Sequence, residues 1–136
     1  MSPTLRFLDT NVLVYAFAKD VRSSVALSIL TEGGIVSVQC LNEFANVMRG
    51  RMAKQWPYVH EALDQIVDLC PAIVPLDRAL HQRGMAIAER FGVHVYDAMI
   101  IAAAFEAGCD TLLSEDMQDG LVLEGKLRIV NPFRQS

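Results

Sequence analysis

Short apolar runs alternate along this chain with segments of helical periodicity. Five runs predict β-strands, at residues 5–8, 35–38, 72–76, 111–113 and 127–130. Pro75 lies inside the third run, which therefore favours an edge position in a sheet. Strands separated by helices imply an α/β fold with a central, mostly parallel sheet and right-handed crossovers.

Four segments between these runs have the periodicity of helices. Three are amphipathic, with apolar stripes in residues 41–48, 59–67 and 80–91. The third stripe follows Asp77, a residue type that caps helix N-termini, and stops before Gly92, which suits a helix C-terminus. Residues 96–107 are apolar on nearly every side and predict a buried helix that ends at Gly108.

Composition indicates one folded domain over residues 1–136. Apolar residues make up 52% of the chain and charged residues 21%, which supplies a core and excludes intrinsic disorder. The longest apolar run, residues 98–105, is far shorter than the roughly 18 residues of a membrane span. The first residues lack the apolar region of a signal peptide, so we expect a cytoplasmic protein with no membrane partner.

The cysteines and histidines give no metal or disulfide pattern. Cys40, Cys70 and Cys109 are odd in number and widely separated, so we expect small buried side chains. No pair of histidines has metal-ligand spacing, although His94 lies three residues before Asp97 and could reach a site there. Dinucleotide, P-loop and serine-hydrolase motifs do not occur.

The net charge limits how this chain could hold nucleic acid. Twelve Lys and Arg residues against 16 Asp and Glu residues leave a net charge of −4. A broad basic surface that grips phosphates by charge alone is therefore not expected. Any bound nucleic acid needs a local device that brings the phosphate in.

Three aspartates fall where an open parallel sheet binds its ligands, at the carboxyl ends of its strands. Asp9 directly follows the first predicted strand, Asp116 lies just past residues 111–113, and Asp97 opens the apolar helix. Each has a structural alternative, namely a helix N-cap for Asp9, a turn residue for Asp116 and a partner of the helix dipole for Asp97. Carboxylates that converge must share protons or bind a cation, and oxygen ligands suit Mg²⁺ or Mn²⁺. Such an ion would let an acidic protein hold a polyanion.

Glu43 is a fourth candidate acid. It points away from the stripe at residues 41–48, on a helix face shared with Gln39 and Asn46. Periodicity alone predicts that this face is solvated. Glu43 has a functional interpretation only if that face lines a cleft.

Four segments, in this order, resemble the motifs of PIN-domain nucleases. They are FLDTNVLVY at residues 7–15, LNEF at 41–44, YDAMIIAAA at 96–104 and LLSEDMQDG at 112–120. The four motifs together span almost the whole chain. Within that superfamily the chain is similar to the short VapC-type toxins of toxin–antitoxin modules.

The resemblance implies a PIN-like α/β/α sandwich that binds Mg²⁺ or Mn²⁺ and hydrolyses RNA with a metal-activated water. It also implies a homodimer and inhibition by a cognate antitoxin protein. Matched by position, the acidic site consists of Asp9, Glu43, Asp97 and Asp116. Asp9, Asp97 and Asp116 are then the metal ligands, and Glu43 acts through water.

Other residues acquire roles through the same resemblance. Thr10, Asn11 and Ser114 match polar positions that orient the carboxylates. Asp119 is either a further acid of the site or a loop residue.

Basic residues close to aromatic ones offer a way to hold substrate. Arg49, Arg51 and Lys54 cluster just after the Glu43 segment, near Trp56. Cations interleaved with aromatic rings can hold a nucleic-acid backbone and stack bases, or can contact a protein partner. The alternative is a solvated loop around a half-buried Trp56.

Two competing classes of function remain at this stage. One is a non-catalytic interaction module whose acidic pocket binds a partner, for instance through an arginine of that partner. The other is a phosphoryl-handling domain with Asp9 as nucleophile. That second class is disfavoured because position 11 is Asn rather than Asp and no Lys directly follows Leu113.

Overall fold

The computed structural model describes residues 5–134. Its strands are β1 (Arg6–Leu8), β2 (Val36–Ser37), β3 (Ile73–Val74), β4 (Thr111–Leu113), β5 (Val122–Leu123) and β6 (Leu127–Val130). Its helices are α1 (Thr10–Ala16), α2 (Ser23–Glu32), α3 (Val38–Arg49), α4 (Trp56–Leu69), α5 (Arg78–Phe91) and α6 (Val95–Glu106).

The strands form a mostly parallel sheet, as the sequence predicts. Four strands run in the order β1-β4-β6-β5, and only β5 pairs antiparallel with its neighbour. β2 and β3 form a parallel pair beside β1, to which they connect through a bridge between Phe7 and Ile35. The Ile35 N–H donates to the Arg6 carbonyl at 2.9 Å, and the Leu8 N–H donates to the Ile35 carbonyl at 2.9 Å. β3, next to Pro75, lies at the end of this array, which confirms its edge position.

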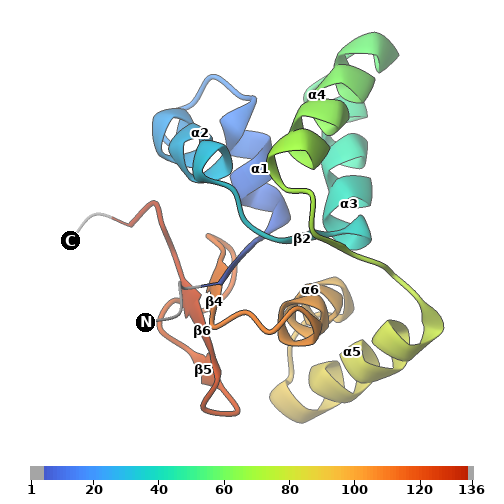
Figure 1. Ribbon diagram of the computed structural model, residues 1–136, viewed down its shortest axis with the longest axis vertical. Helices are drawn as coiled ribbons and strands as arrows, with labels where there is room; N and C mark the ends of the chain where they lie inside the picture. Colours follow the sequence, from blue (N-terminus) through green and yellow to red (C-terminus); the bar gives the residue numbers. More distant parts are fainter. Residues whose placement is uncertain (1–4, 135–136) are drawn as a thin grey trace.

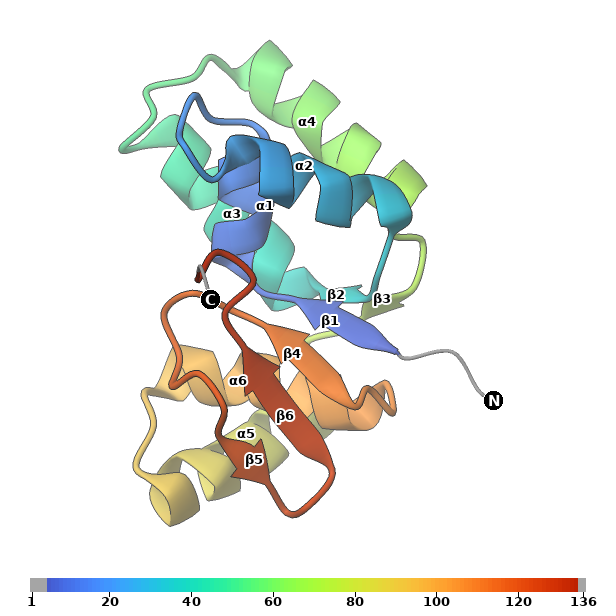
Figure 2. The ribbon, with the colours of Figure 1, turned by 90° about the vertical axis from the view of Figure 1, so that its left-hand side faces the viewer.

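Helices flank the strands in two groups (Figures 1 and 2). α5 and α6 lie together on one side, and α1 to α4 gather on the other. Parallel strands covered in this way have to be apolar on both faces, and Phe7, Leu8 and Leu112 are fully buried. The layered α/β/α fold predicted for the chain is therefore confirmed.

Local sequence signals account for several helix ends. The Asp77 carboxylate accepts from the Leu80 N–H at 2.8 Å, and Gly92 ends α5 in the left-handed conformation, both as predicted. Every residue from Ala98 to Ala104 in α6 is buried, so the apolar segment is a core helix. α5 crosses α6 at Gly84, where a Cβ atom would lie 2.5 Å from the Met99 sulfur.

The structure corrects some boundaries and adds two elements. The second predicted strand is shorter than residues 35–38 because Val38 already begins α3, whose first turn is capped by the Ser37 hydroxyl. The sequence analysis does not predict α2 or β5, and it anticipates α1 only through the N-cap alternative for Asp9. α2 buries Ala26, Ile29 and Leu30 but leaves other apolar residues exposed, so its pattern is mixed. β5 has only two residues and depends on pairing with β6.

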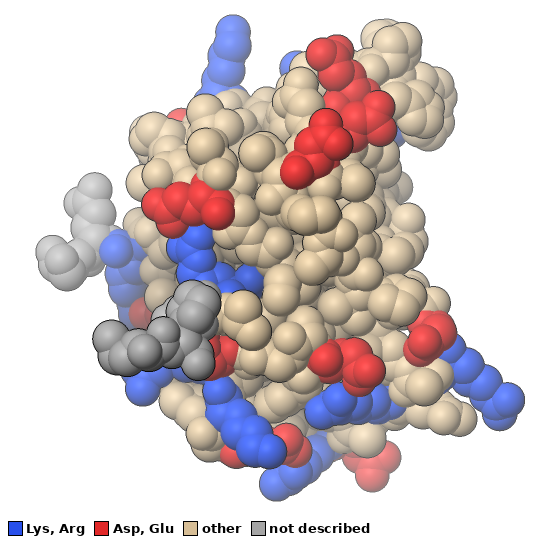
Figure 3. All heavy atoms as spheres, in the orientation of Figure 1, with Lys and Arg blue, Asp and Glu red and all other residues tan. Residues whose placement is uncertain are grey.

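Other sequence-based expectations can be compared with the described residues. All three cysteines are buried and free, as predicted. Within residues 5–134, no helix has both the length and the apolar character to cross a membrane. On the face shown in Figure 3, basic side chains lie among acidic ones toward the edges, and the middle of the face is a broad uncharged area. No continuous basic surface is present on that face, in line with the net charge.

Strand register brings two polar segments together at one edge of the sheet. Leu8 of β1 pairs with Leu113 of β4, so the chain leaves the two strands side by side at Asp9 and Ser114. The Asp9 N–H donates to the Leu113 carbonyl at 3.0 Å and extends the ladder by one bond. The first and fourth sequence motifs therefore meet at the carboxyl edge, where parallel sheets bind ligands.

Candidate active site

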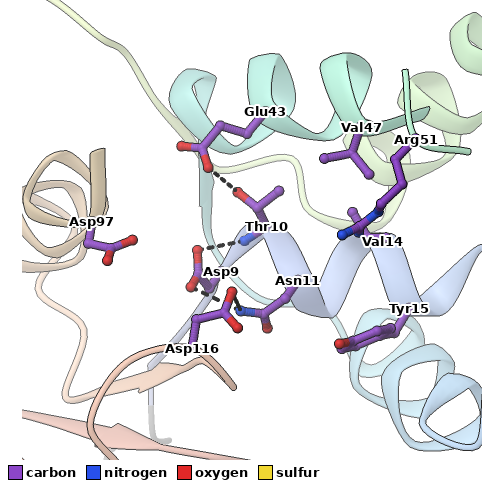
Figure 4. A pocket seen from close by; sticks show the side chains of 10 residues that line it. All are labelled: Asp9, Thr10, Asn11, Val14, Tyr15, Glu43, Val47, Arg51, Asp97 and Asp116. Atoms are coloured by element: carbon purple, nitrogen blue, oxygen red, sulfur yellow. Dashed lines mark hydrogen bonds between the residues drawn. The ribbon is translucent and has the colours of Figure 1, made fainter. Parts of the chain in front are cut away.

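A cavity of about 230 Å³ opens at this edge. Its walls come from Asp9 and α1, from α3 and the loop after it, from the first turn of α6 and from the loop after β4 (Figure 4). The lining residues are Asp9, Thr10, Asn11, Val14, Tyr15, Glu43, Val47, Arg51, Asp97 and Asp116. The four acids predicted from the sequence thus surround one space, although they come from four separate segments.

Asp9 is the most buried of these acids, with only 4% of its surface exposed. Its carboxylate accepts hydrogen bonds from the Thr10 N–H at 2.7 Å, the Ser114 hydroxyl at 2.7 Å and the Asn11 amide at 3.3 Å. Burial raises the pKa of Asp9 to about 7, against the opposing effect of the Ser114 and Thr10 hydrogen bonds. The charges of Asp97 and Glu43 raise this pKa further. Asp9 also occupies the N-cap position of α1. It therefore has the helix-capping role given above as its structural alternative, and it lines the cavity as well.

Glu43 contradicts the solvated face that periodicity alone predicts. It is half-buried on α3 and projects into the cavity (Figure 4). Gln39 donates to the Glu43 carboxylate at 2.7 Å, and the Thr10 hydroxyl donates to the same carboxylate at 3.5 Å. Burial raises the pKa of Glu43, and the charge of Asp97 adds to this effect. The periodicity failed because α3 faces a cleft here instead of open water.

Asp97 and Asp116 complete the acidic wall. Asp97 lies half-buried in the first turn of α6. Burial raises the pKa of Asp97. The charge of His94 lowers this pKa, and the charge of Asp116 raises it. Asp116 is exposed at the cavity mouth and accepts from the Asn11 amide at 3.2 Å. Asn11 therefore donates to two carboxylates, those of Asp9 and Asp116.

The chemistry of these donors fits a hard divalent cation. Among residues 5–134, none of the four carboxylates forms a salt bridge. Nor do any three acidic, His or Cys side chains in this range lie close enough together, as they are placed here, to hold a metal ion. Mg²⁺ and Mn²⁺ suit such a site because they retain several waters and need few direct carboxylate ligands. Asp9, Asp97 and Asp116, the metal ligands that the family resemblance implies, all line this cavity.

The predicted basic cluster divides in the structure. Arg51 lines the cavity on the side away from Asp97 (Figure 4). Arg49 lies over the Trp56 ring at 4.4 Å and donates to the Lys54 carbonyl at 3.0 Å. The Lys54 amine lies over the Tyr58 ring at 4.8 Å. Arg49 and Lys54 thus pack on aromatic rings of this chain, and Arg51 is the member that reaches the site.

Two other candidates lie outside the cavity. Asp119 accepts from the Asn131 N–H at 2.8 Å and from Arg134 at 2.9 Å, which lower its pKa. This pairing favours the loop-residue interpretation of Asp119. His94 is exposed at the N-cap of α6, with its ring 5.7 Å from that of Tyr96.

Sequence reasoning missed a group of residues beside the cavity. Tyr15 lines it, and its hydroxyl donates to Glu115, which also binds Arg22. Burial raises the pKa of Tyr15 to about 12. Arg22 and Glu115 are 93 positions apart, and no local pattern pairs them. The available signals were that Tyr15 is the last residue of the first motif and that Glu115 lies inside the fourth.

Comparisons with known proteins agree with this fold. The family model described as PIN domain matches residues 6–118. No curated protein matches the chain significantly. Three solved structures share the fold at low sequence identity, and each comes from a bacterial toxin or toxin–antitoxin complex.

The three structures differ in how much of the chain they cover. A toxin–antitoxin complex from Klebsiella pneumoniae has a TM-score of 0.71 at 19% identity and covers 96% of this chain and 99% of its own. VapC20 from Mycobacterium tuberculosis, described as a Sarcin-Ricin loop cleaving toxin, has a TM-score of 0.65 at 16% identity, with 82% and 89% covered. VapBC2 from Rickettsia felis, bound to a DNA fragment from its promoter, has a TM-score of 0.61 at 19% identity, with 83% and 89% covered.

Proposed function

Because this chain belongs to the PIN-domain family, we propose that it is a divalent-metal-dependent endoribonuclease and the toxin of a type II toxin–antitoxin pair. The observation that carries this proposal is the state of Asp9. A carboxylate that is only 4% exposed, with a pKa raised to about 7, faces a cavity lined by three more acids. An uncompensated acidic cavity of this kind is costly for the fold and is typical of functional sites.

The residues of the cavity would have different roles in the reaction. Asp9, Asp97 and Asp116 would hold Mg²⁺ or Mn²⁺ at the carboxyl edge of the sheet. Such an ion, when bound, supplies positive charge for a phosphate oxygen and lowers the pKa of a water. Glu43 has the raised pKa and the half-buried position that suit a carboxylate taking a proton from water in the cavity. Thr10 and Gln39 orient the Glu43 carboxylate through their hydrogen bonds.

The partners follow from the same proposal. The similar structure from Klebsiella pneumoniae is a toxin–antitoxin complex, that from Rickettsia felis is VapBC2, and VapC20 is described as a Sarcin-Ricin loop cleaving toxin. By analogy, this chain cleaves RNA in the cytoplasm, forms a homodimer and is inhibited by a cognate antitoxin. Arg51 at the cavity mouth is placed to contact a phosphate of the RNA.

A paired cleavage assay tests the proposal. Wild-type protein, Asp97→Asn and the surface control Asp64→Asn are purified identically, freed of antitoxin and mixed with structured RNAs in Mg²⁺, Mn²⁺ or EDTA. Asp64 is exposed on α4 and lies outside the cavity. We expect wild type and Asp64→Asn to cleave RNA with metal, and Asp97→Asn and all EDTA samples to be inactive.

Two results would count against the proposal. Equal cleavage by wild type and Asp97→Asn would show that another site or a contaminant is responsible. Absence of cleavage by wild type on RNA from its own host, together with tight binding of the antitoxin, would favour the non-catalytic interaction module.

A further inference from the structure

Beside the acidic cavity lies a second charged group, which we call the Arg22 cluster: Tyr15, Asp20, Arg22 and Glu115. Arg22 donates from Nη1 to both carboxylate oxygens of Glu115, at 3.0 and 2.9 Å. It also donates from Nε and Nη2 to Asp20, at 2.6 and 2.8 Å. Its guanidinium lies over the Tyr15 ring at 4.1 Å. Arg22 therefore joins the segment before α2, helix α1 and the loop after β4.

Within this cluster the Glu115 carboxylate is fully engaged. It accepts from the Tyr15 hydroxyl in addition to Arg22. The Tyr15 ring is itself fixed edge-on against Phe133, with the centroids 5.2 Å apart. Glu115 does not line the cavity, whereas its neighbour Asp116 does. The side chains of Glu115 and Asp116 thus point to different surroundings, and that of Glu115 is held away from the proposed metal ligands.

The backbone of Glu115 touches the site directly. Its N–H donates to the Asn11 side-chain oxygen at 3.2 Å. This bond fixes which end of the Asn11 amide is the acceptor, so the amide nitrogen faces Asp9 at 3.3 Å and Asp116 at 3.2 Å. On the other side of Glu115, the Ser114 hydroxyl donates to Asp9 at 2.7 Å. The position of one peptide unit therefore sets several bonds to the candidate ligands.

We propose that Glu115, held by Arg22 and Tyr15, is a positioning residue that fixes Asn11 and the 114–116 turn, and so sets the affinity of the site for its divalent ion. This inference rests on the proposed function, because it assumes that the acidic cavity binds metal. Outer hydrogen-bond partners of metal ligands commonly change affinity by about 10–100-fold when they are replaced. Glu115 acts through its neighbours and takes no direct part in the reaction.

The test compares variants that break the pair with a matched control. Arg22→Gln and Glu115→Gln each remove the ion pair, and the double variant closes a thermodynamic cycle. Arg83→Gln is the control, because Arg83 also binds a glutamate, Glu106, at 3.2 Å and lies over an aromatic ring, yet is outside the cavity. Three quantities are measured on each full-length protein: the Mn²⁺ dissociation constant by electron paramagnetic resonance, the Asn11 side-chain amide signals by NMR without metal, and Tm.

The expected result is a coupled loss at the site. Arg22→Gln and Glu115→Gln should each weaken Mn²⁺ binding about tenfold. The double variant should bind Mn²⁺ no more weakly than Arg22→Gln alone, because that substitution already breaks the Arg22–Glu115 pair. The Asn11 amide signals should shift in both variants and stay unchanged in Arg83→Gln. Arg22→Lys, which keeps the charge but not the forked geometry, should recover part of the Mn²⁺ affinity.

Other outcomes would overturn the inference. Wild-type Mn²⁺ affinity and an unshifted Asn11 amide in Glu115→Gln, with only a lower Tm, would make the pair purely structural. If Arg22→Gln does not fold, the nearly isosteric Glu115→Gln carries the test alone. If wild type binds no Mn²⁺, the proposed function fails, and the Asn11 signals still decide whether Glu115 positions this residue.

Discussion

Acidic side chains in this protein fall into two regions with opposite electrostatics. In the cavity, burial raises the pKa of Asp9 to about 7, and the pKa values of Glu43 and Asp97 are raised as well. In the neighbouring Arg22 cluster, hydrogen bonds from Arg22 lower the pKa of Asp20 to about 2. Burial thus favours the neutral form of the acids in one region, whereas an arginine favours the charged form of Asp20 in the other.

A cation supplied by the chain itself distinguishes a structural ion pair from a candidate metal site. Asp20 and Glu115 have a cation supplied by the chain, the Arg22 guanidinium, at 2.6 and 2.9 Å. The cavity acids have no such partner among the described residues, although Arg51 lines the same space. An arrangement that lowers stability without a ligand is consistent with a cation supplied from outside.

Neutralising an acid of the cavity should have a much larger effect on RNA cleavage than neutralising an ion-paired acid outside it. Asp9→Asn should reduce metal-dependent RNA cleavage about 1,000-fold, roughly 4 kcal/mol in the barrier, because it removes a charge that faces the metal position. Asp119→Asn should stay within about twofold, because Asp119 is paired with Arg134 outside the cavity. Single-turnover cleavage rates measure both. A comparable loss in Asp119→Asn would place that acid in the site after all.

The opposite pKa shifts of Asp9 and Asp20 also predict how the free energy of unfolding depends on pH. The folded-state pKa of Asp9 is about 7, above the unfolded value near 3.8, so its contribution favours folding at low pH and is lost as pH rises toward 7. In EDTA, the free energy of unfolding should fall by up to about 3 kcal/mol from this group between pH 5 and pH 8. Asp20 has the opposite sign, and its stabilising effect is lost only below about pH 4.

Urea unfolding at several pH values tests this difference. The decline between pH 5 and pH 8 should be much smaller in Asp9→Asn, which has no proton to lose there. A decline of equal size in the variant would mean that folded Asp9 is ionised throughout this pH range and that its pKa is not raised.

Added metal should reverse the instability of the cavity. At pH 8, Mn²⁺ at about ten times its dissociation constant should stabilise wild type by about 1.4 kcal/mol, because it binds the folded state alone. Asp119→Asn should gain the same amount, and Asp97→Asn should gain little. Denaturant midpoints with and without Mn²⁺ provide the measurement. Equal stabilisation of Asp97→Asn and wild type would locate the ion elsewhere.

Much of this site was accessible from sequence because strand ends and motif positions are local. Asp9 and Asp116 follow predicted strands, and a parallel sheet brings such positions to one edge. Asp97 opens a helix whose apolar character is plain in the sequence. Glu43 was harder to place, since helical periodicity cannot distinguish a cleft from open solvent.

The rest depends on contacts between distant segments. Arg22 and Glu115 are ordinary surface residue types until the fold brings the loop after β4 against the start of α2. Likewise, Arg49 and Arg51 are equivalent in sequence, two positions apart after the same helix. Only the structure shows that one packs on Trp56 and the other lines the cavity.

These two arginines give the smallest and most selective prediction. Arg51→Gln should raise the KM for RNA about fivefold, close to 1 kcal/mol, because it removes one phosphate contact at the cavity mouth. Its kcat and Mn²⁺ affinity should stay unchanged, since Arg51 makes no hydrogen bond or salt bridge to the acids among the described contacts. Arg49→Gln should change KM less than twofold, because its guanidinium lies on the Trp56 ring. Steady-state kinetics at several salt concentrations decide the matter, because loss of a true phosphate contact also lowers the salt dependence of KM. An equal effect of both substitutions would mean that RNA follows the whole basic loop and that the cavity mouth has no special role in holding it.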